Sequence, residues 1–181
     1  GCRNCHIVNK EGGFVRAYYK DKLAYAPPIL NGEGNKVVPN WLYGFLNNPI
    51  GLRPWLKIRM PTINFTPAER RAGVRYFMSV DGKKETWYAP ATTPMSDEEK
   101  KLGLQAFTTL KCLDCHSVSD APSSGNTDGD APKLEASNLA PNLSLSRHRL
   151  RYEWIIDWLK DPQKIQPETK MPTFFPLEDD D

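Results

Sequence analysis

This sequence has no long apolar stretch, almost no net charge and few histidines. No apolar run approaches the ~20 residues that a transmembrane helix requires, so we expect no membrane span in this chain. Lys and Arg number 24 against 22 Asp and Glu, and the resulting net charge of +2 gives no indication of a nucleic-acid partner. Only three histidines and four cysteines are present. A site built from histidine and cysteine must therefore use a large share of these few residues.

One short motif that uses them occurs twice. Cysteine pairs separated by two residues, each followed at once by histidine, stand at Cys2–His6 and Cys112–His116. A Cys-x-x-Cys-His run is the attachment signature of c-type haem, because two thiols add to the two vinyl groups of one porphyrin and the histidine reaches its iron. The pairs use all four cysteines, so no disulfide is expected, and a zinc ribbon would need its second pair within about 15–20 residues. The sequence therefore predicts two haem c groups, each with an iron.

The second axial ligands must come from another residue type. His148 is the only histidine left over, so it cannot serve two irons. Methionine is the other common sixth ligand, and Met60 and Met171 stand in near-identical contexts, Arg-Met-Pro-Thr and Lys-Met-Pro-Thr. His6 precedes Met60 by 54 positions, and His116 precedes Met171 by 55. We therefore predict that His6 with Met60, and His116 with Met171, are the metal ligands.

The two motifs belong to an internal repeat. A shift of 113 positions superimposes residues of the first half on like residues of the second: Pro28 on Pro141, Leu30 on Leu143, Trp41 on Trp154, Phe45 on Trp158 and Pro49 on Pro162. One structural unit therefore occurs twice, and we predict a haem domain over 1–80, a linker over 81–95 and a second haem domain over 96–181. Halves of this size bury little surface unaided, and a covalently held haem would supply the missing apolar core.

Helical periodicity and capping signals place the secondary structure. Apolar residues at helical spacing after Pro39 predict a helix that Pro49 ends. Capping boxes that begin at Thr66 and Ser96 predict helices over 66–80 and 97–110, and an apolar stripe predicts a last helix from about Arg149 to Asp161. Residues 9–25 have no clear period and 119–138 are rich in Ser, Gly, Asp and Pro, so both are expected to be loops. The predicted fold class is all-α.

Each half resembles a class I (mitochondrial-type) cytochrome c domain, and the whole chain resembles a di-haem cytochrome c. In that family the carbonyl of a Pro-x-Leu segment accepts the ring N–H of the ligand histidine, which implies this role for Pro28 and Pro141. Trp41 and Trp154 are expected to exclude water from the haems. The resemblance carries the following site residues: Cys2, Cys5, Cys112 and Cys115 for attachment, and His6, Met60, His116 and Met171 for the irons.

Two features depart from the family pattern. Class I domains pack a helix before the haem motif against another after the methionine. The first half has the later helix, 66–80, without an earlier one, whereas the second half has the earlier helix, 97–110, without one after Met171. Either a longer protein or a partner subunit supplies the missing helices, or the two helices present pack against each other across the domains.

Iron with a ligand on both faces has no position for a substrate, which predicts an electron carrier with no catalytic residues rather than an enzyme. The alternative is a di-haem peroxidase-type enzyme with one open iron, at which His148, in the basic run 147–151, would serve. Expected partners are a redox donor and acceptor, including other subunits of a membrane respiratory complex. Covalent haem attachment is normally extracytoplasmic, so we expect a periplasmic or outer-face location for a chain whose leader has been removed.

Overall fold

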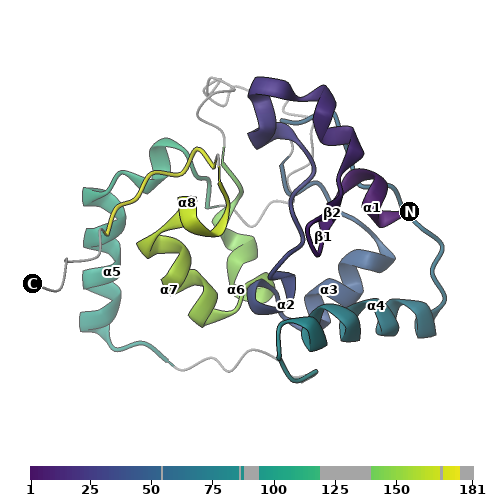
Figure 1. The fold of residues 1–181 in the computed structure, drawn as a ribbon. Helices are drawn as coiled ribbons and strands as arrows, with labels where there is room; N and C mark the ends of the chain where they lie inside the picture. Colours follow the sequence, from purple (N-terminus) through teal and green to yellow (C-terminus); the bar gives the residue numbers. More distant parts are fainter. Residues whose placement is uncertain (54, 86, 88–93, 119–139, 168, 176–181) are drawn as a thin grey trace, which may run out of the picture. The chain divides into compact units, whose positions relative to one another are not determined.

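The structure is a computed structural model that describes residues 1–53, 55–85, 87, 94–118, 140–167 and 169–175. This described part is mostly helical (Figure 1), and its only named strands are β1 (Ile7–Val8) and β2 (Glu11–Gly12), which pair antiparallel. The mostly helical fold class is therefore confirmed. The predicted loop over 119–138 and part of the predicted linker, residues 86 and 88–93, lie outside the described residues.

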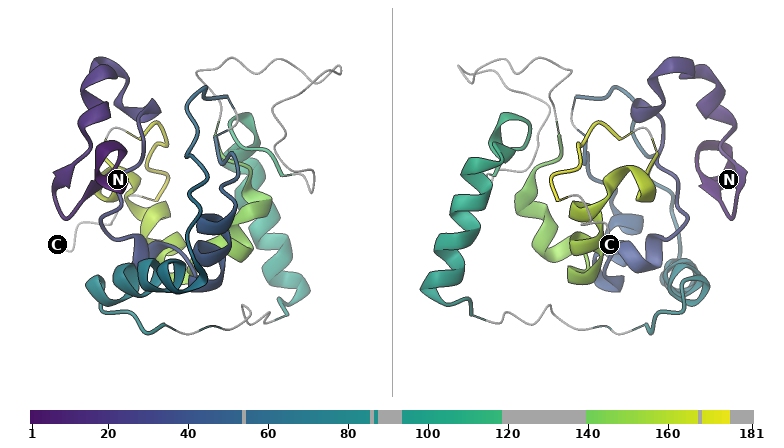
Figure 2. Two further views of the ribbon diagram at one scale, coloured as in Figure 1. Left: turned by 90° about the vertical axis from the view of Figure 1, so that its right-hand side faces the viewer. Right: turned by 60° about the vertical axis from the view of Figure 1, so that its left-hand side comes forward.

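The N-terminal segment has more regular structure than its sequence pattern indicates. It runs through α1 (Cys2–Cys5), β1, β2, η1 (Phe14–Tyr18), η2 (Lys20–Tyr25) and α2 (Glu33–Lys36), and Figure 2 shows these elements following one another. Asn9 and Lys10 turn the hairpin with positive φ values of 53° and 66°. The prediction of a loop over 9–25 was therefore wrong, because 3₁₀ turns and a two-residue hairpin are too short to produce an amphipathic period.

The three helices predicted from periodicity and caps are present as α3 (Pro39–Asn47), α4 (Pro67–Val80) and α5 (Asp97–Thr109). Ser96 and Glu99 form a reciprocal capping box at α5, and Thr66 and Glu69 do the same at α4. The pKa values of Glu69 and Glu99 are both lowered. The larger cause is a hydrogen bond from the backbone N–H of the capping residue, and the smaller one is a hydrogen bond from its hydroxyl. Both caps are therefore complete above the ordinary glutamate pKa and weaken as the pH falls through the lowered value.

Helix α5 is long but buries none of its residues within the described part of the chain. Leu102 is 64% exposed and Leu104 is 70% exposed. Figure 2 shows the helix leading into η3 (Cys112–Asp114), the turn that carries the second cysteine pair.

The C-terminal segment contains η5 (Leu143–Leu145), α6 (Ser146–Arg149), α7 (Tyr152–Lys160) and α8 (Pro162–Ile165). The last helix was predicted to begin at about Arg149, and this start was wrong: α7 begins at Tyr152. The reason is that Leu150 is not helical but forms an antiparallel bridge with Val37. This pairing joins residues far apart in the sequence, so local periodicity contains no sign of it. Pro162 ends α7 as expected, and the Asp161 side chain accepts the Lys164 N–H at 3.0 Å to cap α8.

The chain divides into two compact units, each drawn from several segments. Unit 1 comprises Gly1–Pro39, Arg71–Glu85 and Leu150–Asp181, and unit 2 comprises Asn40–Arg70 and Thr86–Arg149. Helix α4 starts in unit 2 and continues in unit 1. The two haem domains expected from the repeat stay a prediction.

The core of unit 1 forms where α4 meets α2 and the residues around it (Figure 1). Val37 and Val74 are fully buried, and Met78 is 1% exposed. The Asp81 carboxylate, just after α4, accepts the N–H of Gly34 at 2.7 Å. Among the described residues of unit 2, the buried apolar side chains are Leu42 and Leu56.

Gly34 allows α2 to approach α4 closely, because a Cβ at this position would overlap the carbonyl of Phe77. Gly34→Ala is therefore expected to lower the free energy of unfolding by about 1–3 kcal/mol, measured by denaturant titration. Gly44→Ala is the matched control, since nothing lies within 4 Å of a Cβ there, and it should be neutral or raise stability by up to about 1 kcal/mol. Equal stability of the two variants would contradict the close packing.

Candidate haem sites

The first cysteine pair lies on α1, a single helical turn. The turn places Cys2 and Cys5 three positions apart, and the N–H of His6 donates to the carbonyl of Cys2 at 2.9 Å. His6 itself is extended, with φ −105° and ψ 147°. Cys2 is exposed, Cys5 and His6 are half-buried, and both cysteines are free thiols. Two accessible thiols and an imidazole thus leave the same turn.

The second cysteine pair repeats this geometry after α5. Lys111, in the left-handed region at φ 52°, turns the chain from α5 into η3. The N–H of His116 donates to the carbonyl of Cys112 at 2.9 Å, as in the first motif. Cys112 and Cys115 are also free thiols.

Each ligand histidine is held by the same kind of acceptor, the backbone carbonyl of a proline. The ring Nδ1–H of His6 donates to the carbonyl of Pro28, and that of His116 donates to the carbonyl of Pro141, each at 2.7 Å. A partner on Nδ1 sets the tautomer and leaves Nε2 as the nitrogen that can bind a metal. Both hydrogen bonds that the family resemblance implies are therefore present.

A second pair of hydrogen bonds anchors the Pro-x-Leu segments. The N–H of Leu30 donates to the carbonyl of Ile7, directly after His6, and the N–H of Leu143 donates to that of Ser117, directly after His116. Both distances are 2.9 Å. A backbone hydrogen bond made by the leucine two residues after each proline therefore helps to hold the proline carbonyl next to its histidine.

The four methionines have different surroundings. Met60 and Met171 are half-buried in segments without regular structure, and the indole N–H of Trp158 donates to Sδ of Met171 at 2.8 Å. Met78 is buried in unit 1, where the Arg151 guanidinium donates to its sulfur at 3.3 Å, whereas Met95 is 53% exposed. His6 and Met60 belong to different units, as do His116 and Met171, so the predicted ligand pairing stays a prediction.

The two predicted pocket tryptophans occupy matching positions. Trp41 stacks on Phe45 in α3 with ring centroids 4.8 Å apart, and Trp154 stacks on Trp158 in α7 at 5.0 Å. All four rings are half-buried.

Two contacts between a basic side chain and a predicted pocket tryptophan were not predicted from the sequence. Arg149 lies over the Trp41 ring at 5.0 Å and Lys36 over the Trp154 ring at 5.5 Å. The repeat shift of 113 positions also superimposes Lys36 on Arg149, and that match is the signal that would have identified them. His148, the unassigned histidine, is exposed on α6.

The donors present at both motifs fit a c-type haem. Each offers two free thiols from one turn and an imidazole oriented through Nδ1. Across the described ranges, no three His, Cys, Asp or Glu side chains gather in a way that could hold a metal ion by themselves. Comparison of the chain with protein-family models, with curated proteins and with solved structures finds no match.

Proposed function

We propose that this chain binds two c-type haems and transfers electrons. The observation that carries the proposal is the duplication of one complete set of features: a Cys-x-x-Cys-His turn whose histidine donates through Nδ1 to a proline carbonyl at 2.7 Å. A single such turn could be a redox pair or a metal-binding pair. Two turns that agree in thiol spacing, closing hydrogen bond and histidine orientation favour one cofactor bound twice.

In this proposal the chain supplies attachment, orientation and axial ligation. The cysteines would hold the two porphyrins covalently. His6 and His116, oriented by the proline carbonyls, would bind the irons, and Met60 and Met171 would supply the other protein ligands. Bound in this way, the haems supply reversible one-electron chemistry at potentials raised by the thioether ligand. The half-buried aromatic pairs of α3 and α7 would keep water from them.

The proposed setting is extracytoplasmic, next to or within a membrane respiratory complex. The donor and acceptor in this proposal are redox proteins, including other subunits of such a complex. The described helices include none that is long and apolar enough to cross a membrane. Arg147 and His148 are exposed on α6 and, in this proposal, would be available for docking to an acidic partner.

Exposure of the reduced protein to carbon monoxide tests this function against haem catalysis. If both irons have a protein ligand on each face, the as-isolated holoprotein should show no spectral change with carbon monoxide or, when oxidised, with cyanide at concentrations near the protein's. A potentiometric titration of the same sample should show two reversible one-electron steps. Stoichiometric carbon monoxide binding to one haem would instead support a di-haem peroxidase-type enzyme.

The contact between Trp158 and Met171 predicts a difference between the two haems. Under the repeat shift, Trp158 corresponds to Phe45, which has no N–H to donate. A hydrogen bond withdraws electron density from the sulfur, so Trp158→Phe should lower the potential of one haem only. A bond worth about 1 kcal/mol limits the shift to roughly 40 mV for one electron. Tyr152→Phe, on the same helix and 73% exposed, is the control and should leave the potential of that haem within a few millivolts of the wild type.

A further inference from the structure

Each compact unit combines the attachment motif of one repeat with the methionine of the other. Unit 1 contains Cys2–His6 together with Met171, whereas unit 2 contains Cys112–His116 together with Met60. In the first repeat the chain leaves unit 1 after Pro39, and in the second it leaves unit 2 after Arg149. Under the 113-position shift Pro39 corresponds to Tyr152, only three positions from Arg149. The chain therefore leaves the two units at nearly the same place in each repeat. The methionine-bearing part of each repeat is therefore grouped with the haem-attachment part of the other.

The point of exchange in unit 1 is held by paired backbone. Val37 and Leu150, which correspond under the repeat shift, form the antiparallel bridge. One residue further, the N–H of Arg151 donates to the carbonyl of Lys36 at 2.9 Å, and its Nε donates to the carbonyls of Gly34 at 2.9 Å and Val37 at 3.1 Å. The start of α7 is thus attached to the segment that precedes α3 in the other repeat.

The same side-chain contact then occurs once in each unit. In unit 1, Lys36 of the first repeat lies over Trp154 of the second, and in unit 2, Arg149 of the second repeat lies over Trp41 of the first. Both contacts join a basic residue before the exchange point to a tryptophan on the helix after it. Reciprocal contacts of this kind are the pattern made when two like units exchange an identical element.

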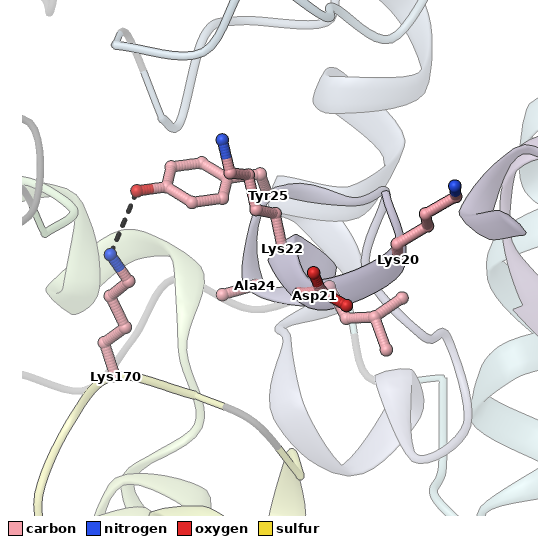
Figure 3. A pocket seen from close by; sticks show the side chains of 7 residues that line it. Lys20, Asp21, Lys22, Ala24, Tyr25 and Lys170 are labelled. Carbon is pink, nitrogen blue, oxygen red and sulfur yellow. Dashed lines mark hydrogen bonds between the residues drawn. The ribbon is translucent and has the colours of Figure 1, made fainter. Parts of the chain in front are cut away.

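The segment that carries Met171 also contacts the first repeat directly. Lys170, the residue before Met171, donates from Nζ to the hydroxyl of Tyr25 at 2.9 Å, and its ammonium lies 4.9 Å from the centre of that ring. Figure 3 shows the two side chains meeting beside the pocket that Lys170 lines together with residues 20–25. Tyr25 stands between His6 and Pro28 in the sequence, within the stretch that forms the first haem site. Met171 is therefore tethered to the repeat that contains His6.

From these contacts we infer that the axial methionines are exchanged between the repeats. The haem attached at Cys2 and Cys5 takes His6 and Met171, and the haem attached at Cys112 and Cys115 takes His116 and Met60. The similar spacings, 54 and 55 positions, do not decide between the pairings, because a duplication produces them in either case. This inference depends on the proposed His/Met ligation and specifies which methionine serves which iron.

Proton NMR of the reduced, two-haem holoprotein separates the pairings. The ring current of a porphyrin shifts the methyl signal of its ligating methionine strongly upfield, and nuclear Overhauser effects trace that methyl group to its own haem and thioether cysteines. The expected result is one upfield methyl signal connected to Cys2 and Cys5 that is lost in Met171→Ala, and a second connected to Cys112 and Cys115 that is lost in Met60→Ala. Met95→Ala is the control and should retain both signals.

The outcomes are distinct even if a variant fails to fold. In the wild-type spectrum, contacts to Trp158 identify the Met171 methyl group, since the two side chains already meet. A Met171 methyl group connected to Cys112 and Cys115 would overturn the exchange and leave the His/Met electron carrier intact. A wild-type spectrum with no upfield methionine methyl signal would overturn the exchange and the proposed ligation together.

Discussion

Cys112→Ala combined with Cys115→Ala is expected to yield a protein that carries a single covalently bound haem. The thioether bonds need both thiols, which leave one turn in the folded chain and are not paired with each other. Intact mass spectrometry under denaturing conditions should show the wild type with two haem additions and the variant with one. Cys2→Ala with Cys5→Ala should show the same loss at the other site.

The motif also supplies its own control. Leu113 lies between the two cysteines and is 57% exposed, so Leu113→Ala should keep both haems. A wild-type protein without covalent haem, when produced with haem-attachment machinery, would remove the basis of the proposed function. Retention of two haems in a double-cysteine variant would show that attachment uses other residues.

Met60→Ala and Met171→Ala are each expected to open one iron completely. Alanine has no sulfur and is too short to replace it, so one haem should lose its methionine-dependent absorption band and bind carbon monoxide. The double variant should bind two equivalents, where the wild type binds none. Optical titration of the reduced proteins measures both quantities.

The other two methionines show whether this effect is specific. Met95 is 53% exposed, and Met95→Ala should change neither the band nor carbon monoxide binding. Met78 is packed in the core of unit 1 beside Arg151, so Met78→Leu should change stability without opening an iron. If Met60→Ala or Met171→Ala left the band unchanged, the assignment of that methionine would be wrong.

Local signals in the sequence were sufficient for much of the fold. Helices α4 and α5 were predicted because a capping residue and a glutamate three positions later satisfy the first free N–H groups within the same turn. Helix α3 was predicted from apolar spacing after Pro39. These features need no partner outside the segment, and the structure contains all three helices close to their expected bounds.

Features that depend on distant residues were not accessible in this way. The break between α6 and α7 exists because Leu150 pairs with Val37, more than a hundred positions earlier. Arg151 likewise looks like part of a basic run, yet its side chain contacts Met78 and two carbonyls near α2. For the candidate sites, the cysteine and histidine spacing was local, whereas the proline acceptors came from the family resemblance. The grouping of each motif with the methionine of the other repeat came only from the three-dimensional contacts.

The central claim is that each of two irons lies between one imidazole and one thioether sulfur. X-ray absorption at the iron edge of the holoprotein, measured once oxidised and once reduced, tests it most directly, because sulfur and nitrogen neighbours scatter differently. The account predicts a sulfur ligand on every iron, in both oxidation states, and six-coordinate metal throughout. Sulfur on only half of the irons, its absence, or a five-coordinate iron would contradict the account and favour a haem enzyme.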